Sequence, residues 1–583
     1  MIRVGNCSGY YGDRISAMRE MLEGGDLDYL TGDYLAELTM LILGRDRMKD
    51  ESLGYARTFV RQMTDSMALA KSNGVRIVAN AGGLNPAGLA DKLREIAASQ
   101  DLDVSIAHIE GDDLLARAGE LGFGDVMTAN AYLGAFGIAS ALKGGADVVV
   151  TGRVTDASVV VGPAIAHFGW GRDDLDRLAG AVVAGHVIEC GTQATGGNFA
   201  GFTNVDMSTA LGFPIAEIGE DGSAVITKHA GTGGAVTVDT VTAQLVYEIG
   251  GPVYLGPDVS TRLDTMTLTQ DGPDRVAISG VVGAPPPETT KVCLNAFGGF
   301  RNSVEFLLTG LDIAEKAELI QRQMESALAA GTVPETVDWQ LDRTDTADPA
   351  TQAQGTALLR CHVKSASPDP VGRAFSDAAI QLALASYPGF SVSRPPAAGT
   401  PYGIYRPAYV PQTKVPHVVV HADGRREDIA PPPALEADAR TSDVPSAGSR
   451  TDELRDWIAQ TVRTPLGRLV YARSGDKGGD ANIGVWIPAD HPARDDAYAW
   501  LVSFLDEATV RELLREAATL DIEIHPLPNL AAVNVVIHGL LGEGVASSTR
   551  LDPQAKAVGE WLRARDCAIP ATLLPAAVAE AAL

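Results

Sequence analysis

Residues 1–210 alternate short apolar runs with helical patterns, and this alternation restricts the chain to few folds. The runs at 75–79 (VRIVA), 103–108 (DVSIAH) and 148–150 (VVV) are typical of buried strands, and polar or glycine-rich turns followed by helical patterns separate them. Strands joined by helices pair in parallel, and the helices cover both faces of the sheet. We therefore predict an α/β fold with a doubly wound, mostly parallel sheet.

The stretch at 144–197 is the strongest candidate for a functional site. Its predicted strand ends in a Thr-Gly-Arg turn, and a candidate helix N-cap follows at 155–158 (TDAS). Ligands of α/β proteins bind outside the carboxyl ends of the strands, where loops and helix N-termini meet. The segment 184–202 adds a histidine, a glutamate, a cysteine and a glycine-rich loop. The predicted catalytic residues are Arg153, Asp156, His186 and Glu189.

Each of these residues also has a purely structural interpretation. Arg153 and Asp156 can form an ion pair that only braces the loop, and Glu189 can cap a helix or order a loop. Cys190 fits a small buried thiol better than a nucleophile, because no histidine can be paired with it from the sequence.

Asp33 and Glu37 lie in a stretch, 28–43, whose apolar spacing predicts one helix. Residues four apart share a helix face. We expect this pair to form a solvated edge rather than a catalytic pair.

Polar and small residues recur at the other predicted strand exits, which indicates one shared pocket. Glycines at such turns let backbone N–H groups face a ligand, whereas a single asparagine is more often a turn residue. Basic residues at the hairpin 213–229 and in the charged loop 473–480 suit an anionic group; surface roles or a salt-bridged turn are the alternatives. The predicted substrate-binding residues are Asn6, Ser8, Tyr11, Asn80, Asn130, Gly196, Gly197, Lys228, Arg473, Asp476 and Lys477.

The composition and the predicted secondary structure change along the chain, and these changes predict its domains. Residues 1–410 form the α/β domain, of which 211–410 is a more β-rich second part. Residues 411–464 are rich in proline and poor in pattern, which predicts a linker. Residues 465–583 have the order of elements of a ferredoxin-like α+β domain.

Composition excludes several function classes. The formal net charge of −27 is spread along the chain, which argues against nucleic-acid binding. No apolar run approaches the roughly 20 residues of a membrane span, and the first residues lack the pattern of a signal peptide. We therefore expect no membrane partner and a cytoplasmic location. The five cysteines are widely spaced without a CxxC pair, so we predict no disulfide framework and no metal site, although metal binding is not excluded.

Several long stretches together resemble the acyclic terpene utilisation protein family. In the first 410 residues they include VGNCSGYYGD, ANAGGLNPAGL, TANAYLGAFGI, GADVVVTGRVTDASVVVGPA, GHVIECGTQATGGNF, TKHAGTGGAV and TVTAQLVYEIGGPVYLGPDV. Further on, YARSGDKGGDANIG, LPNLAAVNVVIHGLLGEG and LDPQAKA resemble the ferredoxin-fold module that is often fused to that domain. The resemblance implies a bacterial role in breaking down branched terpenoid or related acids as coenzyme A thioesters.

We accordingly expect an enzyme that acts on a branched acyl-CoA. The expected reaction is hydration, dehydration or another lyase reaction. Donors aimed at the thioester oxygen and a well-placed acid or base would carry the reaction. No cofactor is predicted besides the coenzyme A of the substrate, and a homo-oligomer is expected. The alternative is a non-catalytic acyl-CoA-binding or scaffold subunit of a terpene-utilisation complex.

Overall fold

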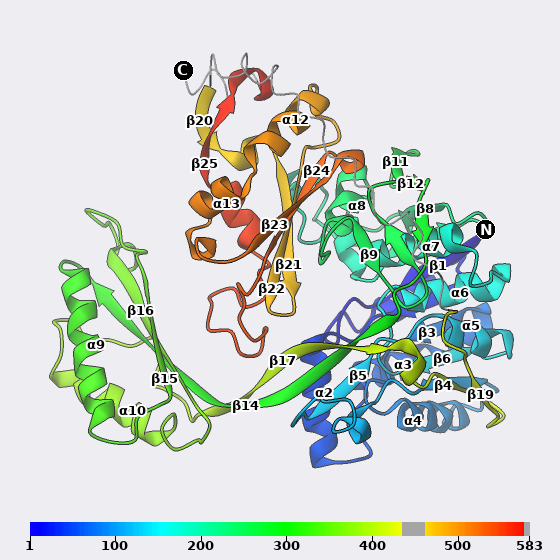
Figure 1. The fold of residues 1–583 in the computed structure, drawn as a ribbon, viewed down its shortest axis with the longest axis horizontal. Coiled ribbons are helices and arrows are strands. Elements are labelled where there is room, and N and C mark those ends of the chain that lie inside the picture. The colour runs from blue at the N-terminus through cyan, green and yellow to red at the C-terminus, as the bar shows by residue number, and fades with distance from the viewer. Residues whose placement is uncertain (434–460, 576–583) are drawn as a thin grey trace. The chain divides into compact units, whose positions relative to one another are not determined.

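The computed structural model describes residues 1–433 and 461–575, and its chain divides into two compact units (Figure 1). Unit 1 comprises residues 1–295, 405–545 and 552–583, apart from the residues outside the described ranges. Unit 2 comprises residues 296–404 and 546–551. None of the described helices is both long and apolar enough to span a membrane.

The largest sheet of unit 1 has 11 strands, and its five central strands are parallel. The order of these five strands is β1-β2-β3-β6-β4, and antiparallel strands extend the sheet on both sides. The central strands are β1 (Ile2–Asn6), β2 (Tyr29–Gly32), β3 (Arg76–Ala79), β6 (Val148–Thr151) and β4 (Ile106–Glu110). The flanking strands are β7 (Pro214–Ile218), β8 (Ala224–Lys228), β12 (Val276–Ser279), β11 (Thr267–Gln270), β18 (Val418–Val420) and β19 (Arg426–Asp428).

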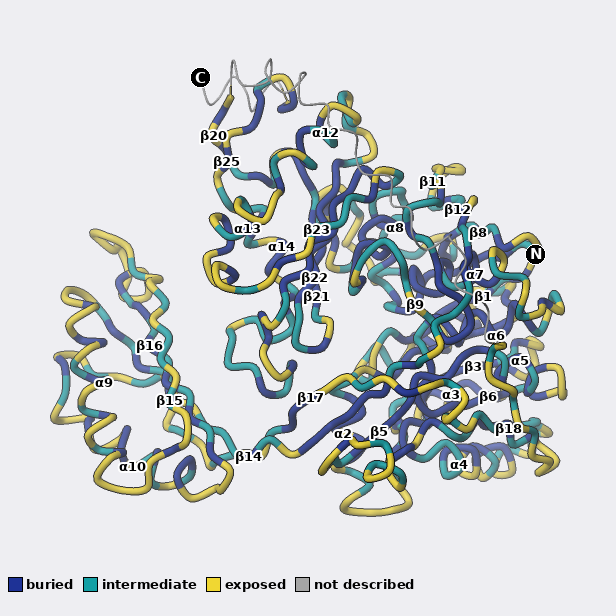
Figure 2. Tube along the Cα trace, viewed as in Figure 1, coloured by how far each residue is buried: buried dark blue, intermediate teal, exposed yellow. Residues whose placement is uncertain are grey.

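Helices cover both faces of this sheet, because successive residues of a strand point to opposite sides. Ile77 and Ala79 pack with the helices of one face, whereas Val78 packs with those of the other. The first face carries α1 (Ala17–Glu23), α3 (Arg57–Asn73) and α4 (Pro86–Ser99). The second carries α5 (Phe136–Lys143), α6 (Ser158–Phe168), α7 (Leu175–Ile188) and α8 (Val238–Leu245). Figure 2 shows the central strands as buried.

The remaining strands of this part of unit 1 lie outside the large sheet. One small sheet has the order β13-β10-β9, with β9 (Val253–Leu255), β10 (Ser260–Arg262) and β13 (Val282–Ala284). Strand β5 (Thr128–Ala131) pairs with the first residues of β14 (Thr289–Thr309). These additions bring residues from the middle of the chain beside the N-terminal strands.

The C-terminal part of unit 1 is an α+β domain with its own core. Its antiparallel sheet has the order β21-β22-β24-β23, and β20 pairs with β25. The strands are β20 (Thr461–Pro465), β21 (Tyr471–Lys477), β22 (Asp480–Trp486), β23 (Ile522–Leu527), β24 (Ala532–Ile537) and β25 (Asp566–Pro570). The helices are α12 (Arg494–Phe504), α13 (Glu507–Leu513) and α14 (Val558–Arg563).

This C-terminal domain packs tightly on the N-terminal part of unit 1. Trp486 is fully buried in the core of the N-terminal part, and its Nε1 donates a hydrogen bond to Asp239 at 3.1 Å. Gly484 lies against Val246, where an added Cβ would come within 2.2 Å of that side chain, so only glycine fits. The two parts therefore share one continuous interface.

Unit 2 is a separate α+β body with the sheet order β15-β16-β14-β17. Its other elements are β15 (Thr336–Asp342), β16 (Thr356–Ser365), β17 (Thr400–Pro411), α9 (Ile313–Ala329) and α10 (Arg373–Ile380). Phe306 and Phe375 are fully buried in its core.

The predicted α/β class is confirmed at the level of a mixed α/β fold with parallel strands at its centre. The predicted helix at 28–43 is wrong: β2 occupies its first part, and α2 (Glu37–Lys49) begins only after the polar turn. Residues 211–410, expected as one β-rich part, divide between the large sheet and unit 2. The expected linker, 411–464, contains β18 and β19, which belong to the large sheet. The three valines of β18 pair with β4. Residues 434–460 lie outside the described ranges.

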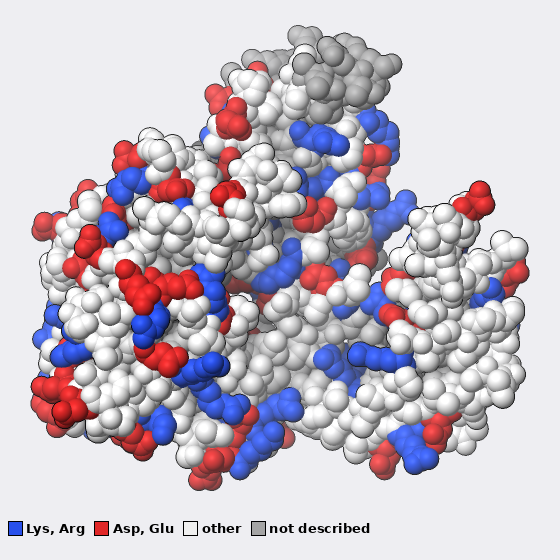
Figure 3. All heavy atoms as spheres, turned by 180° about the vertical axis from the view of Figure 1, so that it is seen from behind, with Lys and Arg blue, Asp and Glu red and all other residues white. Residues whose placement is uncertain are grey.

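The surface charge is mixed. On the face shown in Figure 3, acidic and basic side chains are interspersed.

Candidate functional site

A cavity of about 890 Å³ opens beside the carboxyl ends of the central strands. Loops that follow β1, β2 and β6 supply part of its lining. The end of α7, the segment 247–257, β14, β17, the β21–β22 hairpin and residues 545 and 554–556 contribute further parts. All of the lining residues belong to unit 1. This volume lies within the range of small-molecule sites.

The turn after β2 places Asp33 in the cavity wall, where it is 5% exposed. Asn80, at the end of β3, donates from its Nδ2 to Asp33 Oδ1 at 2.5 Å and accepts a hydrogen bond from the Tyr34 N–H at 2.7 Å. The Leu35 N–H also donates to Asp33 Oδ1, at 3.1 Å. Asn80 therefore acts from behind the wall as the support of Asp33.

The turn after β6 places Arg153 and Asp156 in the same wall. The Arg153 guanidinium donates to the Leu35 carbonyl at 2.9 Å, pairs with Asp156 at 2.9 Å and lies 4.3 Å from the centre of the Tyr132 ring. Its backbone N–H donates to Asp112 at 2.9 Å. These contacts fix a cation that is only 2% exposed.

The end of α7 contributes His186 and Glu189, which are 3% and 5% exposed. His186 Nδ1 and Glu189 Oε1 are 2.9 Å apart. Their other polar atoms, Nε2 and Oε2, are buried and have no hydrogen-bond partner among the described residues. Asn6 fixes the backbone here by donating to the Glu189 carbonyl at 3.3 Å. The pair therefore presents two unused polar atoms within the site.

The loop after β1 packs directly on this turn. An added Cβ on Gly9 would come within 2.6 Å of the Cys190 carbonyl carbon, so the loop needs glycine there. The Gly9 N–H is already donated to Asp13 at 2.9 Å. This loop therefore supports the site by packing, and its Gly9 N–H is used within the loop.

A second charged pair lies where α2 meets β14. Lys291 Nζ is 3.2 Å from Glu37 Oε1, and the Tyr132 hydroxyl donates to the same carboxylate at 3.1 Å. Burial alone would raise the pKa of Glu37, but Lys291 and then Arg153 outweigh it and bring this pKa to about 2. Glu37 is therefore a fixed negative charge.

The ferredoxin-like part supplies the rest of the wall. Lys477, at the tip of the β21–β22 hairpin, donates to the Glu248 carbonyl at 2.5 Å, and its Nζ lies 5.6 Å from the centre of the Tyr254 ring. Lys556 pairs with Glu248 at 3.2 Å and lies 3.6 Å from Asp476. The C-terminal domain thus completes the cavity.

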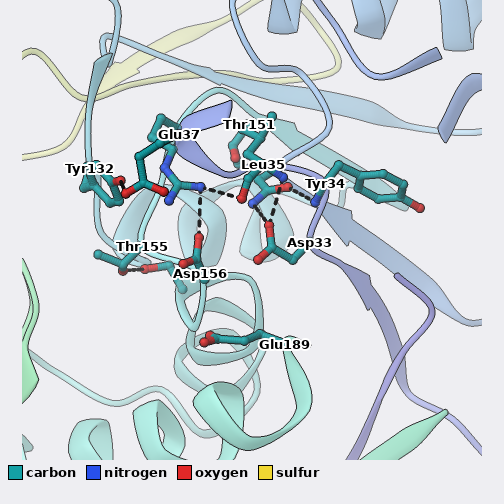
Figure 4. Close-up of polar contacts among 12 residues, drawn as sticks. Asp33, Tyr34, Leu35, Glu37, Tyr132, Thr151, Thr155, Asp156 and Glu189 are labelled. Carbon is teal, nitrogen blue, oxygen red and sulfur yellow. Dashed lines mark hydrogen bonds and ion pairs between the residues drawn. The ribbon is translucent and has the colours of Figure 1, made fainter. Parts of the chain in front are cut away.

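Among the carboxyl groups of the wall, Asp33, Asp156 and Glu189 come from three different segments (Figure 4). Burial first, and then the Asp156 charge, raises the pKa of Asp33 and of Glu189 well above the ordinary range. Burial also raises the pKa of Asp156, although Arg153 opposes that rise. Like charges this close resist ionising together. These shifts favour the protonated forms of Asp33 and Glu189, and Asp156 is the member whose charge has a partner.

His186 carries no charge at neutral pH. Burial, followed by the nearby Lys477, lowers the pKa of His186 to about 4. A neutral imidazole beside a protonated Glu189 forms a pair through which a proton can move.

The structure brings seven of the fifteen predicted residues into the cavity wall: Arg153, Asp156, His186, Glu189, Gly197, Asp476 and Lys477. Four more lie behind the wall and hold it: Asn6, Asn80, Asn130 and Arg473. Asn130 donates to Asp112, which holds the Arg153 backbone. Arg473 lies 4.2 Å from the centre of the Tyr247 ring.

The other four do not line the cavity: Ser8, Tyr11, Gly196 and Lys228. Lys228 pairs with Asp274 at 3.0 Å and donates to the Thr232 carbonyl. The N–H groups of Gly196 and Gly197 both donate within their own loop. Ser8 donates its hydroxyl to the Tyr10 carbonyl at 3.0 Å.

Sequence reasoning missed several lining residues, among them Asp33, Glu37, Tyr132, Tyr247, Glu248, Tyr254, Lys291, Tyr405 and Lys556. The acid pair at 33 and 37 was expected on a solvated helix edge, but Asp33 lies on the turn after β2 and Glu37 is the first residue of α2. Four others of this set, Tyr247, Glu248, Tyr254 and Lys556, lie inside the long stretches at 240–259 and 551–557, which were the available signal.

No three His, Cys, Asp or Glu side chains in the described ranges group in a metal-binding arrangement. The carboxylates nearest to one another instead contact Arg153, His186 and Asn80.

Comparison with known proteins gives the family. The profile described as acyclic terpene utilisation family protein AtuA matches residues 2–421. The profile described as AtuA ferredoxin-like domain matches residues 464–567. No curated protein and no solved structure matches the chain. Because the first match covers most of the sequence, the chain belongs to the acyclic terpene utilisation family and carries that family's ferredoxin-like domain.

Proposed function

We propose that this protein is an enzyme of branched or terpenoid acyl-CoA breakdown, a hydratase, dehydratase or lyase that works by acid and base catalysis. The family supports the terpene context, and the cavity supports the chemistry. Each of these reactions moves a proton at a carbon or oxygen near the thioester and places negative charge on the thioester oxygen. Such a reaction needs one proton donor, one proton acceptor and a nearby positive charge.

The observation that carries the proposal is the group of Glu189, His186 and Asp156 around one cavity. Glu189 has a raised pKa and an unused Oε2, which suits a general acid. Asp156 is the carboxylate that Arg153 stabilises, which suits a general base. Two carboxyl groups whose surroundings set their pKa values apart are the usual basis of such a division of roles.

In a dehydration, Asp156 takes the proton from the carbon beside the thioester, and Glu189 gives its proton to the departing hydroxyl, which leaves as water. The electrons of the broken C–H bond form the new carbon–carbon double bond. Hydration is the reverse. Arg153 is 2.9 Å from Asp156, and its charge also stabilises the negative thioester oxygen.

The mouth of the cavity is suited to hydrocarbon. Tyr10, Leu255 and Tyr409 line it and are 60%, 64% and 66% exposed. Exposed apolar side chains gathered at a cavity mark a binding surface. A branched chain would find contacts there.

The test is turnover of a panel of branched acyl-CoA and hydroxyacyl-CoA esters, read by mass spectrometry as the gain or loss of water or as cleavage. We expect turnover of at least one ester, and a loss of at least about 100-fold in Glu189→Gln and in Asp156→Asn, since a general acid or base contributes about 10²–10⁴-fold. Glu51→Gln, at an exposed turn, is the matched control and should keep full activity. Tight binding without turnover would favour the non-catalytic subunit instead.

A further inference from the structure

Four cationic side chains line the cavity, and one of them differs from the rest. Three form ion pairs with carboxylates: Arg153 with Asp156 (2.9 Å), Lys291 with Glu37 (3.2 Å) and Lys556 with Glu248 (3.2 Å). Lys477 forms no ion pair with any residue of 1–433 or 461–575. It is the cation of the cavity that has no carboxylate partner of its own among the described residues.

The surroundings of Lys477 hold it in place without neutralising it. Its Nζ donates to the Glu248 carbonyl at 2.5 Å and lies over the Tyr254 ring, so its contacts are a dipole and a π face. Glu248 has a left-handed backbone with φ of 56°, and its N–H donates to Asn482 Oδ1 at 2.7 Å. A non-glycine residue in this conformation costs free energy and is found most often at functional sites.

The carboxyl groups around Lys477 are committed elsewhere. The carboxylates whose charges act on it are Glu248, Glu37 and Asp156, and they pair with Lys556, Lys291 and Arg153 respectively. Lys477 is an exposed residue of the cavity wall, so its ammonium group is open to a ligand. A cation in such surroundings is stabilised when an anion binds beside it, because the anion supplies the missing charge.

We propose that Lys477 binds a carboxylate on the acyl group of the substrate. The substrate class is then an acyl thioester that carries a second, free carboxylate, and the ferredoxin-like domain takes part in recognising it. This inference rests on the proposed function, since it assigns one end of the same substrate.

The position of Lys477 favours a carboxylate of the acyl group over a phosphate of coenzyme A. Lys477 lies over Tyr254, whose ring centre is 5.0 Å from that of His186, and His186 bonds to Glu189. The anion site is therefore next to the proposed reacting groups. The long pantetheine arm separates a thioester from the phosphates of its coenzyme A, so a thioester at Glu189 places the phosphates away from Lys477.

Binding measurements with matched ligands test this assignment. Glutaryl-CoA and pentanoyl-CoA have acyl chains of equal length that end in a carboxylate and a methyl group; free glutarate and free coenzyme A complete the set. We expect the protein to bind glutaryl-CoA roughly ten- to hundredfold more tightly than pentanoyl-CoA, the range for a charge-assisted hydrogen bond. Lys477→Met should remove this preference, and Lys477→Arg should keep most of it. Arg468→Met, at an exposed arginine of the same domain, is the control and should change nothing.

Three results would overturn the assignment. The first is equal affinity of the unaltered protein for the two esters. The second is a loss in Lys477→Met that is the same for both. The third is binding of free coenzyme A that depends on Lys477, which would make the anion a phosphate. If free glutarate binds through Lys477 and neither ester binds, the carboxylate site stands and the acyl-CoA function falls, so the two failures can be told apart.

Discussion

Asp112 offers the clearest quantitative prediction, because it is a buried carboxyl group that holds the backbone of Arg153 in the site. It is 2% exposed, and its Oδ2 accepts hydrogen bonds from the Arg153 N–H at 2.9 Å and from Asn130 Nδ2 at 2.8 Å. Burial is the main reason that its pKa rises to about 7 from the ordinary 3.8. Asp112→Asn keeps the size and shape of the protonated acid and cannot become charged.

The sign and size of the effect follow from the shift. Between pH 3.8 and about 7 the folded protein holds a proton on Asp112 that the unfolded chain has released, so the free energy of unfolding falls as the pH rises through this window. A rise of about 3 units at about 1.36 kcal/mol each amounts to about 4 kcal/mol. The Asn variant does not suffer this loss. It should therefore be more stable than the unaltered protein by up to about 4 kcal/mol at pH 8.5 and equal to it below pH 3.8.

Urea unfolding followed by tryptophan fluorescence, at a series of pH values, measures this difference. Asp113→Asn is the matched control: Asp113 is the exposed neighbour, paired with Arg47 at 3.1 Å, and its loss should change stability by less than about 1 kcal/mol at every pH. A gap between Asp112→Asn and the unaltered protein that does not vary with pH would refute the reasoning. So would an Asn variant that is less stable at pH 8.5.

Three further predictions concern the interface, the histidine and unit 2. Asn482→Ala should lower the free energy of unfolding by about 2–3 kcal/mol in urea titrations, because it strands the Glu248 N–H and the Val246 carbonyl, which Asn482 contacts at 2.7 and 2.9 Å. Since the pKa of His186 is about 4, the pH profile of kcat/KM should show no step near pH 6.5; a step there that His186→Gln abolishes would contradict its neutral state. Phe375→Ala should destabilise unit 2 by about 3–5 kcal/mol, seen as lost hydrogen-exchange protection within 296–404 only.

Much of the fold follows from short-range pattern. The valines of β6 make a buried parallel strand, and the loop that follows carries Arg153 and Asp156 to the expected edge of the sheet. The spacing of apolar residues and the residue types at turns are local properties, so they can be read from the sequence. Glu189 was located because a glycine-rich loop follows the helix that presents it.

The cavity residues that the sequence did not predict owe their positions to contacts between distant segments. Lys291 reaches the cavity because β14 pairs with β5, a partner more than 150 positions earlier, and no local pattern specifies that pairing. Asp33 was assigned to a helix because its apolar neighbours also fit helical spacing, whereas tertiary pairing with β1 and β3 makes them a strand. The charged loop that holds Lys477 was recognised, but its place beside His186 depends on how two domains pack.

Solvent-deuterium incorporation tests the central claim most directly, because hydration and cleavage add a proton to the carbon beside the thioester, and dehydration removes one from it reversibly. Acyl-CoA esters that bind would be incubated with the enzyme in D₂O, and the acyl group analysed by mass spectrometry. The account predicts deuterium at that carbon with the unaltered protein, and at least about a 100-fold slower incorporation in Asp156→Asn, with binding retained. Esters that bind but never take up deuterium, or equal uptake by the Asp156→Asn variant, would contradict it.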